Sequence, residues 1–187
     1  ELERRLRTLE EDAARSRRFE RINHALFQIA NSISLASSLD EVFASIHRAL
    51  STIIDTTNFF IALFDEYSDT ITFPYIVDVV DPGCPPIRGV QAEESLTARV
   101  IASRQPLLIS RDEILEMRNR TESQVIRGSI PQVWLGAPLI AHDRLIGVMV
   151  VQSYEHAGLY DQTDTEVISA VAAQVAIAIE QKRMEKA

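Results

Sequence analysis

The stretch that decides the fold is residues 133–153, VWLGAPLIAHDRLIGVMVVQS. It contains two apolar runs, Val133–Ile140 and Leu145–Ser153, which are separated by the polar residues His142-Asp143-Arg144. Apolar runs rich in β-branched residues on both sides of a short polar turn predict a β-hairpin. The longest apolar run, Leu145–Val151, is far shorter than the roughly 20 residues that a membrane-spanning helix requires.

A second hairpin is predicted upstream of the first. The strand Asn58–Phe64 is followed by the polar turn 65–69 and then by the strand Thr70–Val77. The near-continuous apolarity of Asn58–Phe64 indicates that both of its faces are covered, so that it lies inside the sheet. A further short strand is expected at Leu107–Ile109. The segment 81–86, DPGCPP, is expected to be a loop that lies over another part of the molecule.

Helices are predicted before, between and after these strands. Ser38 with Glu41, and Ser110 with Glu113, are capping boxes, in which the serine oxygen and the carboxylate each accept from a free backbone N–H. The predicted helices are Glu1 to about Ser34, Leu39 to near Asp55, Ser95–Arg104, Ser110 to about Arg127, and a last helix that Asp161 or Thr163 caps. Helices combined with antiparallel hairpins predict an α+β fold, in which the helices cover the faces of one sheet.

The first predicted helix carries two apolar seams with heptad spacing. The first seam contains Leu2, Leu6, Leu9, Ala13 and Ser16, and the second contains Phe19, Ile22, Leu26, Ile29 and Ile33. The step from Ser16 to Phe19 is three residues, where heptad spacing requires four. This irregularity, called a stammer, changes the side of the helix on which the seam lies. The last predicted helix keeps the same spacing at Ile168, Val171, Val175, Ala178 and Lys182. These seams predict a homodimer whose interface contains Phe19, Ile22, Leu26, Ile29, Val171, Val175 and Ala178.

Composition excludes several classes of protein. The 187 residues, 46% of them hydrophobic and 25% charged, are enough for one domain with a buried core. A formal net charge of -8, without a basic stripe outside the helix ends, argues against nucleic acid as a partner. The single cysteine, Cys84, excludes an internal disulfide and any CxxC site, and no histidine pair has metal-ligand spacing. No cofactor or metal is therefore expected.

Since no membrane segment is visible, we expect a cytoplasmic protein. Because the chain opens within a helix, we expect a fragment of a longer protein.

Five segments of the chain resemble the GAF domain family in their order and spacing. They are Asn58–Asp65, Leu96–Ile101, Trp134–Leu139, Leu145–Val151 and Gln174–Glu180. The resemblance covers about Leu39 to Glu180. It implies a central antiparallel sheet of about six strands, with the N- and C-terminal helices on one face. Short helices and loops would cover a small-molecule pocket on the other face.

The chain departs from several branches of the family. Ser95 stands where the family often has glycine, and Gln105 stands where a capping glycine is usual. The NKFDE-type signature of the cyclic-nucleotide-binding members is missing, and Cys84 has no following histidine, unlike the cysteine of the bilin-binding members. The methionine-sulfoxide-reducing members need several cysteines, so one cysteine argues against that activity.

The resemblance divides the chain into an N-terminal coiled-coil or signalling helix (1–36), the GAF domain (37–180) and the start of a C-terminal linker helix (181–187). The candidate ligand-binding residues are Phe60, Phe73, Tyr75, Trp134, Gln152 and Ser153, because a small-ligand site needs apolar walls with few polar anchors. Each aromatic residue has an alternative role in the core. Gln152 and Ser153 end a very apolar strand, where they need hydrogen-bond partners.

The resemblance implies a regulatory input module of a larger signalling protein, most often a histidine kinase of a two-component system. In this interpretation, an unknown small ligand alters the packing of the helices in a dimer, and the change reaches a covalently linked effector domain. The alternatives are a diguanylate cyclase as effector, a ligand-free structural dimerisation module, and an enzyme acting on a small molecule. The chain lacks GxGxxG, GxSxG, GKS/GKT and HExxH motifs, so no enzymatic activity and no catalytic residue are expected.

Overall fold

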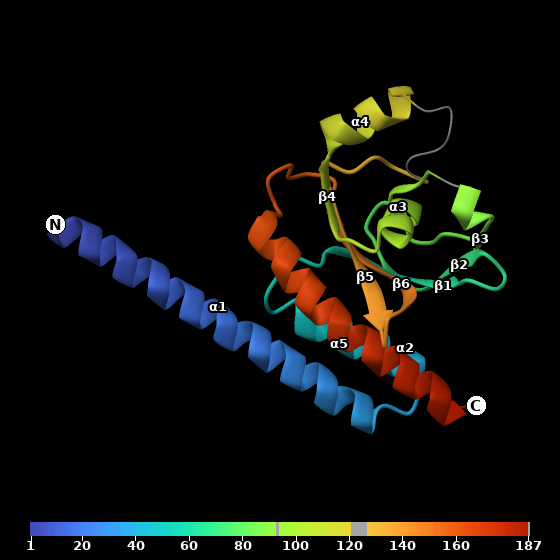
Figure 1. Cartoon of the computed structure of the whole chain (residues 1–187), viewed down its shortest axis with the longest axis horizontal. Helices are drawn as coiled ribbons and strands as arrows, with labels where there is room; N and C mark the ends of the chain where they lie inside the picture. The colour runs from blue at the N-terminus through green and yellow to red at the C-terminus, as the bar shows by residue number, and fades with distance from the viewer. Residues whose placement is uncertain (93, 121–126, 187) are drawn as a thin grey trace.

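The computed structural model describes residues 1–92, 94–120 and 127–186, and its centre is one antiparallel sheet of six strands (Figure 1). The strand order is β3-β2-β1-β6-β5-β4. The strands are β1 (Asn58–Asp65), β2 (Thr70–Val77), β3 (Ile87–Arg88), β4 (Leu107–Ser110), β5 (Val133–Ala141) and β6 (Arg144–Ser153). Both predicted hairpins are present, and β1 lies inside the sheet between β2 and β6. The α+β fold with an antiparallel sheet is confirmed.

Five α-helices and one 3-10 helix belong to the described part of the chain. They are α1 (Leu2–Leu35), α2 (Leu39–Leu50), the 3-10 helix η1 (Val90–Ala92), α3 (Leu96–Ser103), α4 (Arg111–Arg120) and α5 (Gln162–Lys186). The helix predicted to run to about Arg127 is described only as far as Arg120, because residues 121–126 lie outside the described residues. Among the described helices, none combines the length and the apolar character needed to cross a membrane.

The helix caps follow the predicted chemistry with one shift. Ser110 Oγ accepts from the Glu113 N–H, and the Glu113 carboxylate accepts from the Ser110 N–H at 2.8 Å, which completes a capping box. Ser38 caps α2, but the Glu41 carboxylate accepts from Ser37, one residue earlier than expected. Of the two candidate caps of α5, Asp161 performs the role, because its carboxylate accepts from the N–H groups of residues 163 and 164.

The sheet has two different faces because side chains alternate along each strand. On β1, Phe59 and Ile61 point toward α1, α2 and α5 and belong to the largest apolar core. Phe60 points to the opposite face, where smaller clusters pack under α3. Helices α1 and α5 lie side by side on the same face of the sheet and run in the same direction (Figure 1). The ion pair Arg18–Asp164, at 3.1 Å, joins them near the start of α5.

Four of the predicted interface residues are core residues of the single chain. Ile29, Val171, Val175 and Ala178 each expose 1% or less of their surface. Their heptad spacing packs α1 and α5 against each other and against the sheet within one chain, so these side chains are not available to a second copy. This corrects their assignment to a dimer interface. Of the other predicted residues, Leu26 packs against the core, Ile22 is half-buried and Phe19 is 65% exposed.

The apolar seam of α1 changes sides along the helix. Leu2, Leu6 and Leu9 are exposed, whereas Ala25 and Ile29 are buried against the domain. At about 100° per residue, Leu9 lies about 160° around the helix from Ala25. The helix is continuous through the stammer, so the stammer places the two seams on nearly opposite sides. The N-terminal half of α1 extends beyond the rest of the molecule (Figure 1).

Candidate functional site

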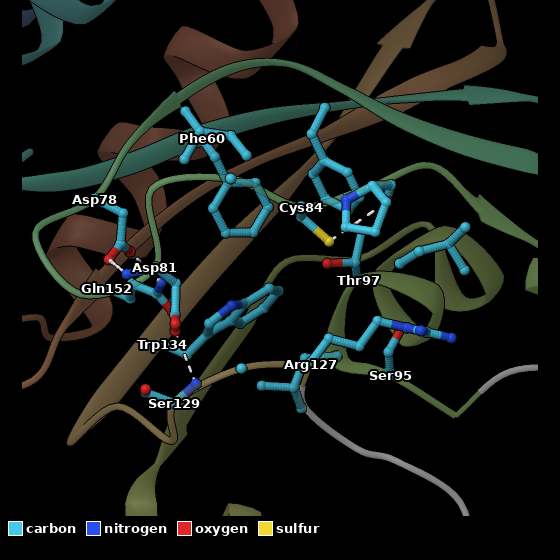
Figure 2. Close-up of a pocket in the computed structure, with 17 residues that line it drawn as sticks. Phe60, Asp78, Asp81, Cys84, Ser95, Thr97, Arg127, Ser129, Trp134 and Gln152 are labelled. Atoms are coloured by element: carbon cyan, nitrogen blue, oxygen red, sulfur yellow. Dashed lines mark hydrogen bonds between the residues drawn. The ribbon is translucent and has the colours of Figure 1, made fainter.

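A cavity of about 290 Å³ lies on the face of the sheet opposite α1, α2 and α5 (Figure 2). Strands β1, β2, β5 and β6 form its floor through Phe60, Phe73, Trp134 and Gln152. Its roof is the loop after β2, including the predicted loop 81–86, together with the start of α3. The volume is close to the lower end of the range of small-molecule sites, which is 300–1,000 Å³ in general.

The floor of the cavity is aromatic. The rings of Phe60 and Phe73 meet edge to face, with centroids 5.8 Å apart. Trp134, which is the only tryptophan, is 3% exposed and lies with its ring over Gly136 of the same strand. A Cβ atom at residue 136 would overlap the outer edge of the indole ring. Glycine at residue 136 therefore sets the position of Trp134 in the cavity.

We expect Gly136→Ala to displace Trp134 and to reshape the cavity. The added methyl group would force the indole to rotate, and overpacking of this kind costs about 1–3 kcal/mol of stability. Tryptophan emission should shift toward that of a solvated indole. Gly83→Ala is the matched control, because residue 83 also lines the cavity but its Cβ would meet nothing within 4 Å. An unchanged emission spectrum in Gly136→Ala would contradict this account of the floor.

Four of the six predicted ligand-binding residues meet at this cavity: Phe60, Phe73, Trp134 and Gln152. Tyr75 lies on the other face, where its hydroxyl is 3.0 Å from Nδ1 of His47. The reason is a bulge in β2, since Ile61 pairs with Tyr75 but Leu63 pairs with Thr72. The extra residue reverses the alternation, so that Phe73 and Tyr75 point to opposite faces.

Ser153 also lies outside the cavity, because it follows Gln152 directly and side chains alternate. Its hydroxyl accepts from the backbone N–H of His156 at 3.1 Å and orders the turn after β6. Ser153 thus has the role of a buried turn residue that bonds to the neighbouring loop. Gln152 alone of this pair points toward the ligand cavity.

A polar wall closes one side of the cavity. The Asp78 carboxylate accepts from the N–H groups of Val80 and Asp81, from Nε2 of Gln152 at 2.7 Å and from the hydroxyl of Tyr154 at 3.0 Å. Burial raises the pKa of Tyr154, and its hydrogen bond to Asp78 adds to this effect. Tyr154 therefore stays neutral and donates a hydrogen bond to the Asp78 carboxylate. The four donors hold Asp78 in a fixed position.

Asp81 joins two loops across the cavity. Its Oδ2 accepts from the backbone N–H of Ser129 at 2.7 Å, and Gly128 packs against the same carboxylate with a φ of +93° (Figure 2). A positive φ favours glycine at residue 128. The loop after β2 is thereby tied to the segment that precedes β5.

Sequence reasoning did not identify Asp78, Asp81, Thr97 or Tyr154 as site residues. Asp78 directly follows β2 and Asp81 comes three residues later, and two acids at the start of a loop that follows a strand with aromatic residues were the available signal. Thr97, which lines the cavity, and Tyr154, which bonds to the lining residue Asp78, gave no signal, because their spacing along the chain is unrelated to their place in the fold. Within the described residues, no group of three or more His, Cys, Asp or Glu side chains could hold a metal ion.

The chain is an α+β domain with a six-stranded antiparallel sheet, the terminal helices on one face and a roofed cavity on the other. The chain belongs to the GAF domain family, whose sequence model matches residues 36–180. GAF domains are generally sensory modules, and this match extends across the sheet and both of its faces. No curated protein matches the chain.

Three solved structures illustrate the likeness in fold. The GAF domain of a phosphoenolpyruvate-protein phosphotransferase from Coxiella burnetii has a TM-score of 0.68 and 15% identity, covering 89% of this chain and 97% of its own. A free methionine-R-sulfoxide reductase from Neisseria meningitidis, in complex with its substrate, has a TM-score of 0.68 and 17% identity. The match covers 88% of this chain and 91% of the reductase chain. The GAF domain of a two-component sensor histidine kinase from Bacillus halodurans has a TM-score of 0.62 and 16% identity. The match covers 81% of this chain and 100% of the Bacillus halodurans chain.

Proposed function

We propose that the chain is a ligand-sensing input module, whose cavity binds a small molecule and whose helices α1 and α5 relay the change to a linked effector domain. The single observation that carries the proposal is that the cavity and the two helices lie on opposite faces of the same strands. A histidine kinase is the proposed effector, and a diguanylate cyclase is the alternative. The similarity in fold to the Bacillus halodurans domain is in keeping with a kinase.

The coupling acts through alternate residues of single strands. On β5, Trp134 lines the cavity, while its neighbours Val133 and Leu135 belong to the core under the helices. On β1, Phe60 lines the cavity, while its neighbour Phe59 belongs to the core under the helices. Because protein interiors are close-packed, a ligand that shifts Trp134 also shifts the surface on which α5 rests. The ligand changes the equilibrium only by its difference in affinity for the two helix packings.

We propose binding and not catalysis as the activity of the cavity. Cys84 lines the cavity and is the only cysteine in the chain. Reduction by a thiol leaves an oxidised sulfur that a second thiol must resolve. The chain offers no second thiol, so we do not extend the activity of the Neisseria meningitidis reductase to it.

We further propose that the exposed half of α1 pairs with the same segment of a second copy. Leu2, Leu6 and Leu9 repeat at heptad spacing, and they lie about half a turn away from the face of α1 that packs on the domain. Helices in proteins gain most of their stability from packing of an apolar face, so an identical partner helix would stabilise the half of α1 that does not pack on the domain. This interface replaces the predicted one that used core residues of α1 and α5.

The double variant Leu6→Gln/Leu9→Gln should weaken dimerisation at least about tenfold, because each copy loses two apolar contacts at the seam. The measurement is sedimentation equilibrium over a range of protein concentrations. Arg4→Gln/Arg7→Gln is the matched control, since both arginines lie on the opposite side of the same helix. A parent protein that stays monomeric at all concentrations would contradict the proposed interface.

The sensing proposal is tested by native mass spectrometry of the purified protein, followed by denaturation to release any bound molecule. We expect a small-molecule adduct whose removal changes the fluorescence of Trp134. The outcome against the proposal is a protein without an adduct whose Trp134 emission does not respond to a metabolite extract. That result would favour the ligand-free dimerisation module.

A further inference from the structure

We infer that the ligand of this cavity carries a protonated amine on a compact apolar or aromatic body. The amine would lie against Asp81 and the side-chain oxygen of Gln152, and the body would lie among Phe60, Phe73 and Trp134. This inference rests on the proposed function, since it assigns a ligand chemistry to the proposed sensing site. The wall of the cavity holds polar atoms that accept no hydrogen bond from the described residues.

The orientation of the Gln152 amide follows from Asp78. A carboxylate only accepts hydrogen bonds, so the NH₂ group of Gln152 must face Asp78, as it does at 2.7 Å. The amide oxygen then points away from Asp78 and has no donor among the described residues. Since Gln152 is 8% exposed and lines the cavity, this oxygen is an acceptor turned toward the cavity.

Asp81 supplies a second unused acceptor on the same wall. Its described side-chain contacts are both at Oδ2, which accepts from the Ser129 N–H at 2.7 Å and lies 3.4 Å from the Tyr154 hydroxyl, whose one proton goes to the nearer Asp78. Oδ1 has no donor in the part of the chain that the structure describes. Figure 2 places Asp81 next to Gln152 and Asp78 at one side of the cavity. Two adjacent acceptors, one of them charged, match an ammonium group, which offers three N–H donors.

The rest of the lining fits the same ligand. Phe60, Phe73 and Trp134 present aromatic rings, which attract cations through their faces and pack against apolar groups. The Trp134 N–H and the Thr97 hydroxyl lie at the cavity without a partner among the described residues, although Trp134 is 3% and Thr97 is 8% exposed. These two groups can hydrogen-bond an oxygen or nitrogen atom elsewhere on the ligand.

The charge of the polar wall argues against an anionic group at that wall. Asp78 and Asp81 form one wall, and Arg127 lies at the other side of the cavity (Figure 2). A phosphate or carboxylate placed at the polar wall would meet two carboxylates and an amide oxygen. An anionic group at the polar wall would be repelled by the carboxylates of Asp78 and Asp81, whereas a cation at the same place is attracted to both.

The test compares three probes of nearly the same shape: 2-phenylethylamine, 2-phenylethanol and 3-phenylpropanoate. Binding to the intact chain is measured by isothermal titration calorimetry and by Trp134 fluorescence at neutral pH. We expect the amine to bind at least tenfold more tightly than the neutral alcohol, and the anion to bind most weakly. The ranking on the parent protein needs no variant. An alcohol or an anion that binds as tightly as the amine would overturn the inference.

A variant pair locates the amine. Asp81→Asn removes the charge while its amide oxygen can still accept from Ser129, so we expect the preference for the amine over the alcohol to fall to less than threefold. Asp40→Asn is the matched control, because Asp40 is exposed on α2, on the other face of the sheet. An unchanged preference in Asp81→Asn would place the amine elsewhere and overturn the inference.

The two proposals fail in different ways. If the alcohol or the propanoate is the preferred probe and perturbs Trp134, the sensing site stands and the amine assignment is overturned. If no probe binds and the purified protein carries no adduct, both proposals are overturned.

Discussion

Val175→Glu should strongly destabilise the folded protein. Val175 is fully buried on α5, in the same core as Ile29 and Leu135. A glutamate there loses the packing of the valine and places an unpaired carboxylate in an apolar interior. An uncompensated buried charge costs about 3–5 kcal/mol. This is a large part of the 5–15 kcal/mol that stabilises a typical domain.

The measurement is urea unfolding followed by circular dichroism. Gln174→Glu is the matched control, because it introduces the same residue one position earlier on the exposed side of α5. We expect its unfolding midpoint to stay close to that of the parent. If Val175→Glu kept the parent midpoint and changed only the molecular mass in solution, Val175 would be an interface residue, and its place in the core of one chain would be wrong.

Gly147→Ala should have the second-largest effect. A Cβ atom at residue 147 would overlap the backbone carbonyl oxygen of Ala62, in the neighbouring strand β1. The obstacle is backbone and not the end of a flexible side chain, so the two central strands would have to separate. We expect a loss of about 3 kcal/mol, at the upper end of the usual cost of overpacking.

The control for this substitution is Gly158→Ala. Residue 158 has open space around its Cβ position, and its backbone lies outside the positive-φ region. Thermal unfolding of the two variants should differ clearly, with Gly158→Ala close to the parent. Equal midpoints for the two variants would show that β1 and β6 can separate locally without a large cost.

The secondary structure could be predicted because its causes are local. Capping pairs such as Ser110 with Glu113 satisfy backbone groups within one turn of the helix, and apolar runs around a polar turn leave few alternatives to a hairpin. The two-residue strand β3 was missed, because Ile87–Arg88 is too short to show any period. The site was predicted where strict alternation holds, as for Phe60 and Trp134.

Predictions failed where a distant contact overrode the local pattern. The bulge in β2 turned Tyr75 away from the cavity; Pro74, which lies in the bulge, was the available signal, but it does not show which neighbouring residues change faces. The heptad seam of α5 was assigned to a second copy. A seam of this kind shows that a helix needs a partner, but it does not show whether the partner belongs to the same chain.

The sequence by itself determined the helices, the hairpins, the family and the two seams of α1, because each depends on spacings of a few residues. Only the tertiary structure decided which seam is exposed, which residues of β2 and β6 face the cavity, and that Asp78 and Asp81 meet Gln152. These outcomes depend on strand pairing and loop closure between distant residues, such as Asn58 and Gln152, which are 94 positions apart. The energies of such contacts arise only when the whole chain has folded.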